Sequence, residues 1–199
     1  MFRYRMFQSR FKARIIAACF AVASALAAQD ASQLGFTDLQ SRANALVERG
    51  QLLEAQPLLL ELVERVRASE EAEIELDFPY FLIGTSSIQS FVQTGETKNL
   101  LQTLEWYGAL ESEYPDSERL KDALLKKVDV LRILQRDEAV ASLIQKLLGG
   151  AYPFSLSYSE QVKLLRDLTQ TYYANNQLEE GLPFFGQLLE TARDFEDPA

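Results

Sequence analysis

Four short interruptions divide a chain that otherwise has the sequence pattern of α-helix, and they recur at a nearly constant spacing. Apolar residues three and four positions apart run through most of residues 36–192, which is the periodicity of an amphipathic helix. The interruptions lie at Gly50, Gly95, Gln135 and Asn176, with spacings of 45, 40 and 41 residues. One helix on each side of every interruption, repeated at this period, predicts a series of stacked helical hairpins.

The first hairpin shows how each interruption is expected to work. The sequence TDLQ at 37–40 has the pattern of a capping box, which opens a helix. Gly50 tolerates the left-handed backbone with which a helix ends, and Leu52 starts a second apolar stripe at once. Gly50 is therefore predicted to be the hinge of this hairpin, and Gly95 and Asn176 are predicted to be the hinges of two later ones.

One stretch departs from the helical pattern. Acidic residues alternate with apolar ones from Glu71 to Phe78, as in a strand with one acidic face that could attract calcium. A calcium site needs oxygens that converge from a turned loop, however, and an extended edge spreads them in a row. We therefore expect a solvated linker or the first turn of a helix.

The first 27 residues have the three parts of a secretory signal peptide. Five basic residues and no acidic residue precede an uncharged run that begins at Ile15. The run of about 14 residues is too short to span a bilayer. It leads to Ala25-Leu26-Ala27, with small residues at the two positions that a signal peptidase reads. We expect cleavage after Ala27 and export to a periplasm or cell envelope, with a flexible mature N-terminus at 28–35.

Two other interpretations of the N-terminal segment are open. The sequence IAAC at 16–19 looks like a lipoprotein processing box, although Arg14 lies too close to the cysteine for an apolar core to precede the cut. An arginine-rich start without acidic residues also fits an organellar transit peptide. The long uncharged run argues against that organellar alternative.

Removal of residues 1–27 makes the chain strongly acidic. It leaves 15 lysines and arginines against 29 aspartates and glutamates, a net charge of −14. Such a surface disfavours nucleic acid and anionic lipid, which require clustered basic residues. The single cysteine, Cys19, leaves with the signal peptide, and a mature chain without cysteine suits an oxidising compartment. No transmembrane helix is expected in the mature chain.

The residue types that carry most enzyme chemistry are missing from the mature sequence. It contains no histidine and no cysteine, which removes the commonest general base, the commonest metal ligand and the thiol nucleophile. Gly149-Gly150 follows a helical pattern and indicates a helix stop, and the sequence has no glycine-rich phosphate-binding loop. We therefore expect no catalytic, metal-binding or cofactor-binding residues, and a protein that is not an enzyme.

The repeats resemble the tetratricopeptide (TPR) family. Residues at the family's consensus intervals are clearest in the first unit, where they are Leu39, Ala43, Leu46, Gly50, Leu52, Ala55, Leu59 and Leu62. The segment Tyr114–Ser117, with sequence YPDS, looks like a junction in TPR proteins of the bacterial cell envelope. The resemblance covers residues 36–192. It implies an all-α fold, a right-handed α-solenoid of about four TPR-like hairpins, with residues 193–199 left as a tail.

The resemblance also implies a binding surface. In TPR proteins the first helix of each hairpin usually lines a concave face, and a protein or peptide is the expected partner. The matching positions carry amides, which pair with a peptide backbone, and arginines, which pair with carboxylates; they are Gln40, Asn44, Thr85, Gln89, Asp129, Arg132, Arg166, Gln170 and Tyr173. A protein–protein interaction scaffold is therefore expected. The alternative is a structural subunit of an envelope assembly, with contacts through its ends.

The last helical segment carries more apolar residues than one helix face can hold. Phe184, Phe185, Leu188, Leu189 and Ala192 span more than one face, and the seven residues after them are too few for a capping helix. Some of these side chains are therefore expected on an open end. The sequence predicts either the N-terminal part of a longer repeat protein, with further repeats, or self-association through this helix.

Overall fold

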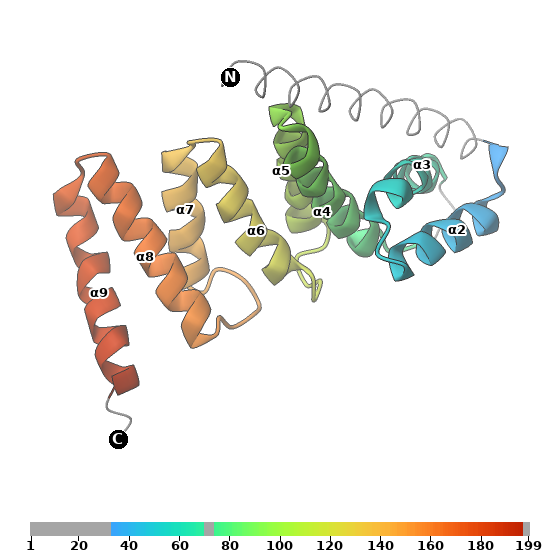
Figure 1. Ribbon diagram of the computed structural model, residues 1–199. Coiled ribbons are helices and arrows are strands. Elements are labelled where there is room, and N and C mark those ends of the chain that lie inside the picture. Colours follow the sequence, from blue (N-terminus) through green and yellow to red (C-terminus); the bar gives the residue numbers. More distant parts are fainter. Residues whose placement is uncertain (1–32, 70–73, 197–199) are drawn as a thin grey trace, which may run out of the picture. The chain divides into compact units, whose positions relative to one another are not determined.

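Residues 33–69 and 74–196 are described by the computed structural model, and all their regular structure is helical (Figure 1). The predicted signal peptide, its cleavage site at Ala27 and residues 70–73 of the acidic stretch lie outside the described residues. The helices, in chain order, are α2 (Phe36–Glu48), α3 (Leu52–Ala68), α4 (Asp77–Thr94), α5 (Thr97–Glu113), α6 (Leu120–Ile133), α7 (Asp137–Leu148), α8 (Tyr158–Ala174) and α9 (Leu178–Glu196).

Successive helices pair into four hairpins, α2 with α3, α4 with α5, α6 with α7 and α8 with α9. The predicted all-α fold and its number of hairpins are confirmed. The chain divides after Arg119 into two compact units, a first unit with α2–α5 and a second unit with α6–α9. Helix α9 continues to Glu196, so it includes part of the segment that was expected to be a tail.

The four hairpin turns each place one residue in the left-handed region of the backbone. In three of these turns the next residue donates a backbone hydrogen bond across five positions, as Gln51 N does to Leu46 O over 2.9 Å. This is the Schellman arrangement that ends a helix. The side chain at the turn varies while the backbone does not: φ is 73° at Gly50, 71° at Gly95, 55° at Gln135 and 57° at Asn176.

The capping box predicted at 37–40 is wrong. Helix α2 has Gly35 as its N-cap, and no side chain caps this end. Thr37 therefore lies inside the helix, two positions after the N-cap, where it cannot act as the cap. A complete capping box opens α8 instead, where the Ser157 hydroxyl accepts from Glu160 N and the Glu160 carboxylate accepts from Ser157 N over 2.7 Å. A short polar residue three positions before an acid or amide forms a capping box only when the helix starts directly after that polar residue.

A close approach at Gly84 joins α4 to α5. A Cβ atom placed on Gly84 would lie 2.4 Å from Tyr107 Cε1, so only glycine fits at this crossing. The side chain of Tyr107 is fully buried, and its hydroxyl lies 3.0 Å from Thr85 Oγ1. Thr103 donates a further hydrogen bond from its hydroxyl to Gly84 O over 3.1 Å. The glycine inside α4 is therefore required by packing and does not mark a turn.

The YPDS segment ties the end of α5 to the beginning of α4. Tyr114 Oη accepts a hydrogen bond from Leu76 N over 3.1 Å. Ser117 Oγ donates to Asp77 Oδ2 over 2.7 Å, and Arg119 pairs with the same oxygen at 2.9 Å. Asp77 is the first residue of α4, so the acidic stretch ends in a helical first turn.

A buried tyrosine links three helices of the first unit. Tyr80 of α4 accepts a hydrogen bond from Arg67 Nε of α3 over 2.9 Å and donates one to Glu113 Oε2 of α5 over 2.8 Å. Arg67 and Glu113 also pair directly at 2.9 Å. Burial and the hydrogen bond to the Glu113 carboxylate raise the pKa of Tyr80 to about 12, because an ionised phenol would lie desolvated beside a second negative charge.

Candidate functional site

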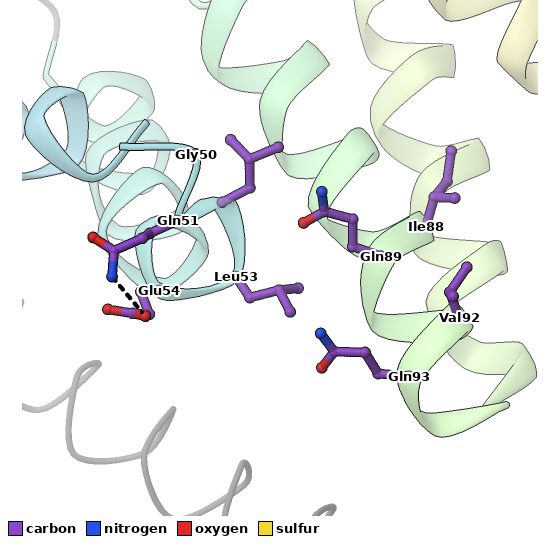
Figure 2. Close-up of a pocket in the computed structure, with 9 residues that line it drawn as sticks. Gly50, Gln51, Leu53, Glu54, Ile88, Gln89, Val92 and Gln93 are labelled. Carbon is purple, nitrogen blue, oxygen red and sulfur yellow. Dashed lines mark hydrogen bonds between the residues drawn. The ribbon is translucent and has the colours of Figure 1, made fainter. Parts of the chain in front are cut away.

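A groove lies in the first unit where the beginning of α3 passes the end of α4 (Figure 2). Its volume is about 590 Å³. We call it the amide groove, because three of the side chains along it are glutamines. The lining residues come from the α2–α3 turn, the first turn of α3 and the last turns of α4; they are Gly50, Gln51, Leu52, Leu53, Glu54, Ile88, Gln89, Val92 and Gln93.

The polar side chains of the amide groove come from both of its sides, two from α4 and two from the turn and first residues of α3. Figure 2 shows Gln89 and Gln93 projecting from α4 toward Leu53 at the start of α3. Neither amide has a hydrogen-bond partner among the residues that the structure describes. Gln51 donates to Glu54 Oε1 over 3.0 Å, so it is partly engaged within its own turn. Each amide can donate and accept at once, which leaves Gln89 and Gln93 available to a polar ligand.

The rest of the amide groove is apolar. Val92 is 77% exposed, and Leu52, Leu53 and Ile88 are half-buried along the walls. A concave apolar surface with a few convergent polar groups is the usual composition of a ligand site in a protein. Two adjacent amides beside apolar walls match a peptide, which presents backbone donors and acceptors next to apolar side chains.

A second hollow in the first unit contains two of the predicted amides. Gln40 and Asn44 of α2 lie beside it, together with Phe78 at the beginning of α4, and its volume is about 410 Å³. The ring of Phe78 is 36% exposed and lies under the Arg119 guanidinium, which is 4.5 Å from the ring centroid. This hollow therefore places predicted binding residues of α2 next to an aromatic surface.

In the second unit, three ion pairs connect α6 with α8. Lys121 pairs with Glu160 at 2.8 Å, Asp129 with Lys163 at 3.0 Å, and Arg132 with Asp167 at 2.9 Å. We call them the α6–α8 ion-pair ladder. All three pairs run between the same two helices, so each of these charges is paired with an opposite charge of its own unit. Two residues predicted to bind a partner, Asp129 and Arg132, are therefore engaged with their own chain.

The last pair of the ladder has one buried member. The Asp167 side chain is 2% exposed while that of Arg132 is 40% exposed. Asp167 Oδ2 is buried and has no hydrogen-bond partner among the described residues. The Arg132 guanidinium is therefore the counter-charge that this buried carboxylate needs, and it is poorly placed to fork onto the carboxylate of a partner.

The nine residues predicted for the concave face are divided between the two units. Gln40 and Asn44 lie together, and Gln89 lies in the amide groove. Thr85 turns inward, where its hydroxyl donates to Phe81 O over 2.9 Å. On α8, Arg166, Gln170 and Tyr173 are exposed. These assignments to a binding face remain predictions.

Sequence reasoning missed Gln93, Val92 and Leu53, although they line the amide groove. Gln89 and Gln93 are four residues apart and thus share one face of α4, which was a usable signal. The contribution of Leu53 had no such signal, because it depends on how closely the start of α3 passes the end of α4.

Comparisons with known proteins define the fold. The chain is similar to a crystal structure from Podosopora anserina of a protein described as a kinesin light chain with nearly identical TPR-like repeats. The TM-score is 0.52 at 14% sequence identity, with 98% of this chain and 93% of that chain covered. A scan against protein-family models finds no match, and neither does a sequence comparison with curated proteins.

The class of protein follows from this likeness and from the four hairpins: the chain has a TPR-like, all-α helical-repeat fold of the solenoid type. In residues 33–69 and 74–196, no group of three or more histidine, cysteine or acidic side chains could hold a metal ion. The described helices are all too short or too polar to cross a membrane.

Proposed function

We propose that this protein is a non-enzymatic scaffold that holds a protein partner by a short peptide segment bound in the amide groove. The observation that carries the proposal is the pair of amides at Gln89 and Gln93, which have no partner among the described residues and lie beside the exposed Val92. A TPR-like fold supports the general role, since such repeats commonly present grooves to peptides.

The groove suits an extended segment with at least one apolar side chain. Gln89 and Gln93 are one helical turn apart, so both amides can reach successive groups of one extended backbone. Each hydrogen bond contributes about 1 kcal/mol net. An apolar side chain of the peptide would cover Val92 and Leu53, and burial of such a contact contributes about 1–2 kcal/mol. Together these contacts suit a weak, reversible interaction.

Titration calorimetry tests this proposal with peptides selected on the wild-type chain from a random-peptide display library. The double substitution Gln89→Ala/Gln93→Ala should weaken binding of the selected peptides about tenfold or more, because two hydrogen bonds are lost. Gln102→Ala removes an exposed amide of α5 outside the groove and should leave the affinity unchanged. Failure to select any peptide, or equal affinity for both variants, would exclude the groove as the binding site.

We also propose that the protein acts outside the cytoplasm, in a periplasm or cell envelope, after removal of residues 1–27. The basic start, the uncharged run and Ala25-Leu26-Ala27 support this location, as does a mature sequence without cysteine. The measurement is the intact mass of the protein recovered from its own cell. A product that begins at Ala28 is expected, whereas a product that keeps residues 1–14 would exclude export by this signal.

A further inference from the structure

Helix α9 carries an apolar stripe that its own unit does not cover. Leu178, Leu182 and Leu189 are 47%, 64% and 70% exposed, and Phe185 between them is half-buried. These four residues are spaced by four, three and four positions, which is the spacing of residues that meet along the contact line of two packed helices. We call the four residues the α9 seam.

The contact of α9 with α8 uses another side of the helix. The ring of Phe184 stacks on that of Tyr172 with centroids 5.7 Å apart. A Cβ atom on Gly181 would lie 3.0 Å from Tyr172 Cβ, so the helices are in close contact there. At 100° per residue, the side that holds Gly181 and Phe184 lies roughly a quarter to a third of a turn from the seam. The seam is therefore separate from the core of the α8–α9 hairpin.

The charges beside the seam indicate what covers it. Glu179 and Arg193 flank the seam on the same side, fourteen positions apart, and Gly186 lies midway between them. Two copies of α9 that run antiparallel around a two-fold axis at Gly186 would place Glu179 of each copy opposite Arg193 of the other. The same register places Leu182 of each copy close to Leu189 of the other. A parallel pair would instead place both Glu179 side chains at one end, where they repel.

The side of α9 that carries the flanking charges is unobstructed at the centre of this arrangement. A Cβ atom added to Gly186 would contact nothing, so the helix surface is open there. The antiparallel register thus covers the apolar seam and pairs both flanking charges.

We propose that α9 forms an antiparallel, two-fold symmetric contact with α9 of a second copy of this chain. The seam is small compared with the area of a stable dimer interface, so the contact should be populated at about 10–100 μM protein. It is independent of the amide groove, which lies in the first unit.

Sedimentation velocity of the full chain over a range of concentrations tests the contact. The wild-type chain should change from monomer to dimer, and Leu182→Glu/Leu189→Glu should remain monomeric with unchanged helicity by circular dichroism. Ile133→Glu alters another exposed apolar residue of the second unit, which is 55% exposed and lies in α6, and it should dimerise like the wild type. A wild-type chain that stays monomeric throughout, or a dimer that survives the seam variant, would overturn the proposal.

The charges test the antiparallel register by themselves. Glu179→Arg and Arg193→Glu should each weaken dimerisation about threefold to tenfold, because each brings like charges together. The double swap Glu179→Arg/Arg193→Glu should restore the wild-type affinity. A double swap that is weaker than either single variant would contradict the register. A monomer that binds no hydrophobic dye would show that another part of the chain covers the seam, and this result would also overturn the proposal.

Discussion

At the scale of single residues, the hairpin turns depend on backbone conformation more than on side chains. Gly50 has φ of 73° and a Cβ atom there would meet nothing, so the cost of a larger residue comes from the backbone alone. Gly50→Val should therefore lower the free energy of unfolding by about 1–2 kcal/mol. Asn176→Val should act in the same direction but less strongly. Thermal unfolding measures both changes.

The third turn supplies the reciprocal test. Gln135 adopts φ of 55° although it is neither glycine nor asparagine. Gln135→Gly should raise the unfolding free energy by about 0.5–1 kcal/mol, because relief of the left-handed strain exceeds the added entropy of the unfolded chain. Unchanged melting in all three turn variants would contradict the idea that these turns set the hairpins.

Gly84 is required for a different reason. Its φ is helical, and the obstacle to a side chain is the ring of Tyr107. Gly84→Ala should destabilise the first unit by about 1–3 kcal/mol, because overpacking outweighs the better helix propensity of alanine. Gly108→Ala is the matched control: it lies in α5, where an added Cβ atom meets nothing. The control should be neutral or stabilising in denaturant titration, and equal effects of the two changes would refute the packing argument.

Tyr80 predicts the response of the first unit to alkaline pH. Its pKa is raised from 10.0 to about 12 by burial and by the Glu113 carboxylate, so the folded state favours the neutral phenol. This stabilisation is complete below pH 10.0 and is lost as the pH rises through about 12. The unfolding free energy of the wild-type chain should fall more steeply in this range than that of Tyr80→Phe. An equal fall of the unfolding free energy with pH in the two proteins would show that the pKa of Tyr80 is not raised by folding.

At the scale of helices, the ion-pair ladder distinguishes two arginines that had been predicted to act alike. Arg132 neutralises the buried Asp167, whereas Arg166 is exposed on the surface of α8. Arg132→Glu should lower the unfolding free energy of the second unit by about 2–4 kcal/mol, because it leaves a buried charge unpaired beside another carboxylate. Arg166→Glu should change it by less than about 0.5 kcal/mol. Equal stability of both variants would mean that the Arg132–Asp167 pair contributes nothing.

The helices themselves could be read from the sequence, and their contacts could not. Apolar periodicity located every hairpin, because a helix must bury one stripe of side chains. The start of α2 was misplaced, since several short polar residues near a helix end can each fit a capping pattern. The Gly84–Tyr107 contact and the amide groove were not predicted, because each depends on the distance between two helices that no local pattern encodes.

At the scale of the whole molecule, resemblance and structure agree on the fold. The four-hairpin TPR-like fold was predictable because the residues at its turns recur at a nearly constant spacing in the sequence. The predicted concave face stays a prediction. It was taken from positions in each hairpin without regard to neighbours, and Asp129 and Arg132 have charged neighbours on α8 that engage them.

The central claim is that a peptide segment binds between the beginning of α3 and the end of α4. Hydrogen–deuterium exchange of the full chain, with and without a peptide selected on it, tests this claim most directly. The account predicts slower exchange at residues 50–54 and 88–93, the two segments that line the amide groove, with α6–α9 unchanged. Protection confined to α9, or protection nowhere in the first unit, would contradict it.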